Sequence, residues 1–257
     1  TFYLFMTQVI YNRTYNHNIN DYEHTYRLEI YGNLFGDNWG CTICRPFASM
    51  LKDVPQVKSV VYYCPYVNQT DVKVNNRTMT VPVVNMSKPG IEFFTGKLIS
   101  GSSKAWGTGA TAILNRSTAE KMFGTANAAG KTFEINTDDG GTKPITVVGV
   151  SEDMPDNCTI PNGMYLCDNE SGMTDWSEWS YYIYVRLDNG ASPEKVVRGL
   201  KQGFMKANGI SPKDEKEFDK QMKFRITSID DVYFSGIGQQ DKGNRSLVDV
   251  LTVASVF

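Results

Sequence analysis

The chain has 257 residues, and 41% of them are hydrophobic, which is enough for a packed interior. Its 26 basic and 28 acidic side chains leave a net charge of −2. This balance lacks the basic excess of nucleic-acid-binding proteins, so we expect no nucleic-acid partner. A chain of this length predicts two lobes or one large domain.

Both ends of the chain are apolar. It begins with TFYLFM and ends with LVDVLTVASVF. No run reaches the roughly 18 to 20 apolar residues that cross a bilayer, and no signal-peptide pattern opens the sequence. We expect both ends to be the margins of membrane spans, with two terminal helices docked on the core as the alternative.

The first part of the chain predicts a strand, a helix and a second strand. Aliphatic and charged residues alternate at 26–31, as in a strand. Apolar residues then recur with helical spacing from Pro46, which suits a first turn, to Pro55, which suits an end. Residues 57–66 are β-branched and aromatic, as in a second strand.

Two hairpins are predicted in the middle of the chain. The first covers 71–86, with its turn at residues 75–76, which are both asparagine. The second covers 130–150, with an Asp-Asp-Gly-Gly turn that begins at residue 138. The middle section is therefore rich in β-structure.

One short helix is expected between these hairpins. A strand at 111–114 precedes it, and Ser117 with Glu120 fits the capping box that opens a helix. Gly124 stands where this helix should stop, since glycine is favoured just past a helix end.

The final third repeats the order of the first. Residues 181–187 predict a strand, Ser192 is a candidate N-cap for a helix that ends near Gly209, and residues 223–234 predict another strand. Two strand-helix-strand units thus flank a β-rich section at about 90–170. The pattern predicts an α+β protein with an inserted subdomain.

No catalytic constellation can be assembled from the sequence. There is no P-loop, no dinucleotide-binding fingerprint, no G-x-S-x-G and no H-E-x-x-H. Cys41 and Cys44 have the C-x-x-C spacing of a metal or redox motif. No second pair follows them, and His17 and His24 both precede them.

Two acidic pairs, Asp138-Asp139 and Asp230-Asp231, are interpreted as solvated carboxylates of a turn and of a strand end. We therefore predict no catalytic, cofactor-binding or metal-binding residue, and no enzymatic activity.

Residues 176–180 read WSEWS, which matches the W-S-x-W-S signature of class I cytokine receptors. A receptor of that class needs β-sandwiches with paired cysteines, whereas this chain has five cysteines and several predicted helices. A ligand-binding receptor or solute-binding ectodomain is the alternative function. We expect instead that Trp176 and Trp179 seal the hinge between two lobes.

Four blocks of the middle section carry a family resemblance. They read FFTGKLISG (93–101), ILNRSTAEKMFG (113–124), ANAAGKTFEI (126–135) and ITVVGVSEDMP (145–155). In order and spacing they resemble the periplasmic core domain of MacB-like, FtsX-type ABC transporter permeases. The matching residues are Phe93, Phe94, Gly96, Gly101, Asn115, Ala119, Phe123, Gly124, Gly130, Lys131, Val147, Val148, Gly149, Val150, Asp153 and Pro155.

The resemblance runs nearly end to end and implies the domain organisation. A porter-like lobe of two strand-helix-strand units, at 23–90 and 176–240, should carry an inserted, mostly-β (Sabre-like) lobe at 91–175. A stalk at 1–22 should continue the first membrane span, and a stalk at 241–257 should lead into the second.

The resemblance also implies a function. Such a domain lies in the periplasm as part of an inner-membrane protein of a Gram-negative bacterium, uses no cofactor, and passes ATP-driven conformational change to periplasmic substrates or partners. The expected partners are its own membrane spans, a cytoplasmic ATPase, a second copy in a homodimer, and a periplasmic adaptor, outer-membrane channel or lipoprotein. A disulfide between Cys158 and Cys167, and the roles of Cys41 and Cys44, stay open.

Overall fold

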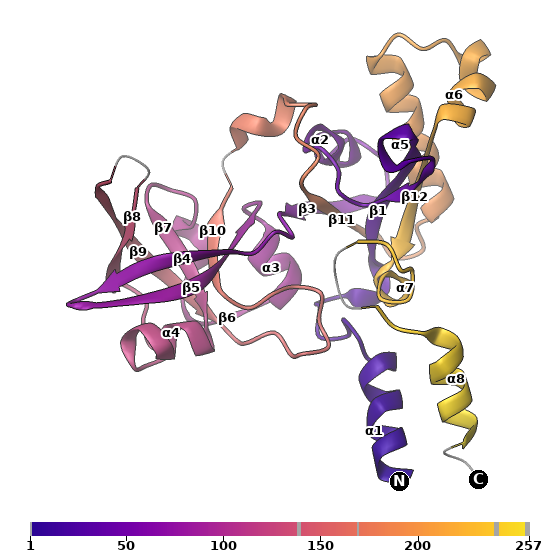
Figure 1. Ribbon diagram of the computed structural model, residues 1–257. Helices are drawn as coiled ribbons and strands as arrows, with labels where there is room; N and C mark the ends of the chain where they lie inside the picture. Colours follow the sequence, from indigo (N-terminus) through magenta and orange to yellow (C-terminus); the bar gives the residue numbers. More distant parts are fainter. Residues whose placement is uncertain (1, 138–139, 169, 239–241, 255–257) are drawn as a thin grey trace. The chain divides into compact units, whose positions relative to one another are not determined.

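The computed structural model describes residues 2–137, 140–168, 170–238 and 242–254 (Figure 1). Its contacts divide the chain into two compact units. Unit 1 comprises Thr1–Val60, Asn157–Thr159 and Met173–Phe257, and unit 2 comprises Val61–Asp156 and Ile160–Gly172. Within the described ranges, every helix is too short or too polar to span a bilayer.

Unit 1 combines an antiparallel sheet with helices. Its elements, in chain order, are α1 (Phe2–Arg13), β1 (Thr25–Gly32), β2 (Asn38–Gly40), α2 (Pro46–Lys52), the start of β3 (Val57–Tyr63), β11 (Tyr182–Leu187), α5 (Pro193–Ala207), α6 (Glu215–Gln221), β12 (Met222–Ser228), α7 (Ile229–Val232) and α8 (Arg245–Ala254). Strand β1 is central and pairs antiparallel with β11, β12 and β2.

The charged residues of β1, which alternate with Leu28 and Ile30, are buried. Arg27 and Glu29 are both fully buried, and the Arg27 Nη2 lies 2.5 Å from the Glu29 Oε1. Arg225 of β12 also donates to Glu29, at 2.7 Å. Alternation therefore identified the strand correctly, but its charged residues are covered, and Glu29 is paired there with Arg27 and Arg225.

Unit 2 is built on a closed β-barrel. Its elements are the remainder of β3, β4 (Asn68–Val74), β5 (Arg77–Met86), α3 (Gly90–Thr95), β6 (Leu98–Gly101), β7 (Thr111–Asn115), α4 (Arg116–Phe123), β8 (Thr132–Asn136), β9 (Thr142–Ser151) and β10 (Met164–Cys167). Among the described residues, six strands close a ring in the order β5, β4, β8, β9, β7 and β10, because β10 pairs in parallel with β5. Strand β6 lies outside this ring and pairs with β9.

One apolar core fills the barrel. Alternate residues of its strands point inward, and Ala119 and Met122 of α4 join the same cluster. The buried members are Val72, Val74, Val81, Val83, Ala112, Leu114, Ala119, Met122, Ala128, Phe133, Ile145, Val147, Val150 and Met164. A closed barrel has no free strand edges along its ring, which favours a rigid unit.

Most of the predicted elements are confirmed. The first hairpin turns at residues 75–76, where Val74 pairs with Arg77 and Asn75 adopts a φ of 55°, as a two-residue hairpin loop requires. The strand expected at 223–234 is too long, because β12 ends at Ser228 and α7 follows. The Ser228 hydroxyl accepts from the Asp231 amide and so caps α7.

The capping box predicted for α4 is wrong. The helix begins at Arg116, one residue before Ser117, and its N-cap Asn115 makes no side-chain capping bond. The Asp153 carboxylate, from the end of β9, accepts from the Ser117 amide at 2.9 Å. A distant residue therefore supplies the cap that the local sequence pattern was expected to provide.

The units do not begin at the boundaries expected for the lobes. Unit 2 starts at Val61 within β3, whereas the inserted lobe was placed at 91–175. The first hairpin belongs to unit 2 because β4 pairs with β8 and β5 pairs with β10. The chain enters unit 1 briefly at Asn157–Thr159 and returns to it at Met173.

Candidate functional site

The two terminal helices, α1 and α8, lie side by side in unit 1 (Figure 1). We call them the terminal helix pair. Arg13 of α1 donates to Asp249 of α8 at 3.2 Å, while Val9 and Val248 are buried. Each helix also exposes large apolar side chains, which are Tyr3, Leu4, Phe5 and Ile10 on α1 and Leu247, Val250 and Val253 on α8.

The helix pair meets the rest of unit 1 at a polar junction with α7, which we call the helix base. The Tyr15 and Tyr233 rings stack with centroids 3.8 Å apart, and the Tyr233 hydroxyl donates to Asn12 at 2.8 Å. His17 lies 2.7 Å from Asp230. Aromatic stacking and hydrogen bonds thus attach α1 firmly to α7.

The pair Asp230-Asp231 belongs to this junction. Sequence reasoning placed these carboxylates at a solvated strand end, but they stand in the first turn of α7, where acidic residues complement the helix dipole. Asp230 contacts His17, and Asp231 forms an ion pair with Arg245 at the start of α8. The other acidic pair, Asp138-Asp139, lies outside the described residues.

A pocket of about 300 Å³ opens at the helix base, lined by Arg13, His17, Asp230, Phe234, Arg245, Val248 and Asp249. Its charged groups are mostly engaged with one another, as in the Arg13 and Asp249 pair. The arrangement fits a junction that holds two helices together.

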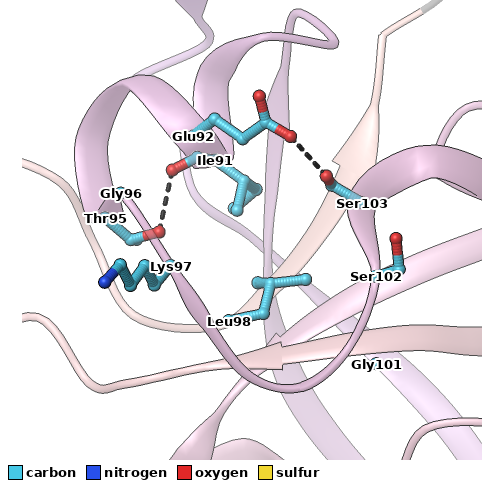
Figure 2. Close-up of a pocket in the computed structure, with 9 residues that line it drawn as sticks. All are labelled: Ile91, Glu92, Thr95, Gly96, Lys97, Leu98, Gly101, Ser102 and Ser103. Carbon is cyan, nitrogen blue, oxygen red and sulfur yellow. Dashed lines mark hydrogen bonds between the residues drawn. The ribbon is translucent and has the colours of Figure 1, made fainter.

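A second pocket, of about 350 Å³, lies in unit 2 between α3 and β6 (Figure 2). Figure 2 shows the Ser103 hydroxyl donating to Glu92, at 2.5 Å, and the Thr95 hydroxyl donating to the Ile91 carbonyl, at 2.8 Å. Lys97 is its other charged lining residue. One carboxylate held by one hydroxyl provides neither a nucleophile with its base nor a set of metal ligands.

The WSEWS segment packs within unit 1. Trp176 contacts the Phe47 ring of α2 and the Phe204 ring of α5, with centroids 5.3 and 5.9 Å apart, and Trp179 contacts Phe47 at 6.1 Å. Glu178 forms an ion pair with the buried Arg45. These tryptophans cover an aromatic cluster of unit 1, and Trp176 keeps 41% of its surface exposed.

The cysteines of the C-x-x-C run are buried. Burial raises the pKa of the Cys44 thiol to about 12 and also raises the pKa of Cys41. Both thiols are therefore protonated at neutral pH, which is unfavourable for nucleophilic or metal-binding chemistry. Of the other three, Cys158 belongs to unit 1, whereas Cys64 and Cys167 belong to unit 2.

The described residues contain no group of three or more histidine, cysteine, aspartate or glutamate side chains placed to hold a metal ion. The two histidines are distributed between different local pairs: His17 contacts Asp230, and His24 lies 2.6 Å from Asp21.

The residues that carry the family resemblance are structural parts of unit 2. Asn115 donates to Asp153, and the Ser117 hydroxyl donates to the same carboxylate. Although burial raises the pKa of Asp153, these hydrogen bonds and the charge of Arg116 outweigh it, so the pKa lies below its ordinary value. Two separate sequence blocks thus meet where α4 begins.

Glycines of the blocks allow close backbone approach. Gly101 has a φ of 77°, and a Cβ atom there would lie 2.2 Å from the Val148 carbonyl oxygen. A Cβ at Gly149 would lie 2.5 Å from a methyl of Leu98. The pairing of β6 with β9 therefore requires glycine at Gly101, where the contact is with backbone, whereas at Gly149 the Leu98 side chain would have to move.

Comparison with solved structures supports the fold. A domain of a protein described as a permease from Porphyromonas gingivalis superposes with a TM-score of 0.66 at 18% identity, covering 91% of this chain and 98% of that one. The periplasmic region of MacB from Actinobacillus actinomycetemcomitans superposes with a TM-score of 0.53 at 15% identity. The match covers 85% of this chain and 94% of that one.

A third similar structure is the extracellular domain of the noncanonic ABC-type transporter YknZ from Gram-positive bacteria. It gives a TM-score of 0.50 at 14% identity and covers 79% of this chain and 99% of that one. The fold therefore also occurs outside Gram-negative cells. No curated protein matches the sequence significantly.

The family model for the MacB-like periplasmic core domain matches residues 13–202. This range contains the whole barrel, the four sequence blocks and most of the unit 1 sheet. The chain belongs to the MacB-like periplasmic core domain family, whose members are extracytoplasmic parts of ABC transporter permeases.

Proposed function

We propose that this chain is the coupling module of an ABC transporter permease and transmits ATP-driven movement of the membrane spans to periplasmic substrates or partner proteins. The observation that carries the proposal is the terminal helix pair. Its helices lie side by side, are joined by Arg13 and Asp249, and expose apolar side chains along their length. In this account, residues 1–22 and 241–257 form a stalk that continues toward two membrane spans.

The helix base gives the pair a firm hold on unit 1. Tyr15, Asn12 and His17 of the first stalk segment contact Tyr233 and Asp230 in or next to α7. Strand β12 ends where α7 begins, so a tilt of α1 acts on the sheet through a short connection. A rigid body attached in this way moves as a unit when its helices tilt.

The two units support the proposed division of labour. Unit 1 would act as the porter-like lobe, and unit 2, with its closed barrel, as the inserted Sabre-like lobe. The module would catalyse no bond-making reaction. Its partners would be the membrane spans, a cytoplasmic ATPase, a second copy in a homodimer, and a periplasmic adaptor, an outer-membrane channel or a lipoprotein in a Gram-negative envelope.

Distance measurements in the full-length transporter test this proposal. Spin labels at Ile10 and Val250, which are 55% and 63% exposed, report the separation of α1 and α8. We expect their distance distribution to shift when a non-hydrolysable ATP analogue binds. Asn76 and Lys143, which are both exposed in unit 2, provide a control pair. The distance distribution between labels at these two positions should stay unchanged, because the barrel moves as one body. Identical distributions for the first pair in both states would contradict the proposal.

A further inference from the structure

The connection between β9 and β10 contains three residues that leave unit 2. Asn157, Cys158 and Thr159 belong to unit 1 by their contacts, although Asp156 before them and Ile160 after them belong to unit 2. Their partners are at the end of α1, in the segment Tyr11–Asn16. We call these three residues the clasp.

Asn157 binds the last turn of α1. Its side-chain amide lies 3.2 Å from the Tyr11 carbonyl, 3.3 Å from the Thr14 carbonyl and 3.0 Å from the Thr14 hydroxyl. The last carbonyls of a helix lack partners within the helix and need donors from elsewhere. Asn157 thus supplies a C-terminal cap from a position that is remote in sequence.

Asn16 completes the clasp from the other side. It is fully buried and has a left-handed φ of 69°. Its side-chain oxygen accepts from both the amide and the hydroxyl of Thr159, each at 2.7 Å. Its own amide donates to the Asn157 carbonyl at 2.8 Å, and its side-chain nitrogen contacts the Ile229 carbonyl of α7 at 3.4 Å.

The left-handed conformation of Asn16 is central to the clasp. Asparagine is among the few residues that tolerate a left-handed conformation, and here that conformation lets one side chain serve both the clasp and α7. A buried amide with all these bonds is costly to pull apart, since separation would leave its polar groups unsatisfied. The clasp therefore resists separation from the end of α1.

We propose that the clasp is a mechanical link that transmits displacement of α1 directly to the β9 and β10 strands of the barrel. Asn16 and Asn157 are its positioning residues. The chain leaves the clasp through Asp156 toward β9 and through Ile160 toward β10, so a pull on the clasp acts on both strands by covalent connection. This inference rests on the proposed coupling function and adds a second route beside β12 and α7.

Amide hydrogen exchange on the 257-residue chain tests the link in both directions. Asn157→Ala should speed exchange at residues 11–16 on the order of tenfold, because the last turn of α1 loses its cap. The matched control is Asn162→Ala. Asn162 lies in the same connection and exchanges two hydrogen bonds with Met154, at 2.7 and 2.8 Å, but is not part of the clasp. Asn162→Ala should leave the exchange rates of residues 11–16 unchanged.

A double-mutant cycle tests transmission itself. Gln8→Gly weakens α1 at an exposed position. With an intact clasp it should speed exchange at residues 160–164, which lie beyond the clasp in unit 2. In a chain that already carries Asn157→Ala, Gln8→Gly should cause no further increase in exchange at residues 160–164, because the link is broken.

Two outcomes would contradict the proposed link. In the first, Gln8→Gly leaves the exchange rates of residues 160–164 unchanged in the chain with an intact clasp. In the second, Gln8→Gly raises those rates equally in the presence and absence of the Asn157 side chain. If Asn157→Ala fails to fold, Thr159→Val replaces it, since valine keeps the shape and the amide bond but removes the hydroxyl. These measurements need no nucleotide, so their failure is distinct from a failure of the spin-label experiment on the transporter.

Discussion

The two units bury different kinds of side chain. Among the described residues, the fully or nearly buried charges are Arg27, Glu29, Arg45 and Arg186, and all four lie in unit 1. Unit 2 buries neutral polar groups and fills its barrel with apolar side chains. The unit that carries the terminal helices thus relies on buried ion pairs, and the barrel relies on apolar packing.

Under the proposed coupling function, this difference suits two mechanical tasks. Apolar packing in a closed ring is non-directional and gives a body that keeps its shape under load. A buried ion pair contributes little net stability, but breaking it is costly, so it fixes which groups face one another. Under the proposed coupling function, unit 1 would be the part that holds a set geometry while the terminal helices move.

The largest expected effect tests the buried charges. Glu29→Gln leaves Arg27 and Arg225 facing a neutral amide, and the loss of a buried partner charge should lower the free energy of unfolding by about 3 to 5 kcal/mol. Chemical denaturation monitored by tryptophan fluorescence measures it. Glu217→Gln is the control, because the side chains of Glu217 and its partner Lys220 are 61% and 72% exposed and loss of this pair should have a much smaller effect. Equal losses would remove the distinction between buried and exposed pairs in unit 1.

The next effect tests packing in unit 2. Gly101→Ala should destabilise the chain by about 3 kcal/mol, since the new Cβ meets the Val148 carbonyl and the left-handed φ of 77° is unfavourable for alanine. Gly109 has a similar φ of 66° but open space around it, so Gly109→Ala should cost only about 1 kcal/mol. A larger loss at Gly109 than at Gly101 would show that close packing of β6 on β9 is not limiting.

Trp179 offers a smaller effect in unit 1. Trp179→Ala removes ring contacts with Phe47 and Phe35 and a hydrogen bond to the Trp176 carbonyl, and should cost about 1 to 2 kcal/mol, since the ring is only half-buried. Trp106→Ala, at a fully buried position of unit 2, should cost about 3 to 5 kcal/mol. Comparable losses at the two sites would mean that the WSEWS segment is more deeply packed than the structure shows.

The smallest effect depends on pH. The lowered pKa of Asp153 means that its ionised form is favoured in the folded state, so its contribution is present above its ordinary pKa of 3.8 and is lost as pH falls through the folded value. Asp153→Asn should therefore cost about 1 kcal/mol at pH 7, and this difference should shrink below about pH 4. A difference that persists unchanged at pH 3 would assign the effect to shape instead of charge.

Local patterns predicted most elements of this fold. Periodicity located β1, β11 and α5, and the asparagine pair located the first hairpin turn. Closure of the barrel was not predicted, because it depends on parallel pairing of Met164 with Val83, which are far apart in sequence. The cap of α4 was misassigned for the same reason, since Asp153 follows the helix by many residues.

The candidate site was harder to predict than the fold. The terminal helices were expected from their apolar sequence, but the clasp was not, because Asn157-Cys158-Thr159 has no periodicity and joins α1 only in three dimensions. The four sequence blocks that carry the family resemblance lie in the barrel unit, where close packing limits which side chains fit. The residues that attach α1 are polar side chains whose roles depend on their partners.

Reversible locking of the terminal helix pair tests the central claim most directly. Cysteines replace Arg13 and Asp249, which contact one another, and a short bifunctional thiol reagent joins them in the full-length transporter. Single-cysteine variants treated with the reagent control for reaction at the native cysteines. If relative movement of α1 and α8 is a step of the ATP cycle, cross-linking should slow ATP hydrolysis severalfold, and removing the cross-link should restore it. Hydrolysis at the full rate with the cross-link complete would contradict the account.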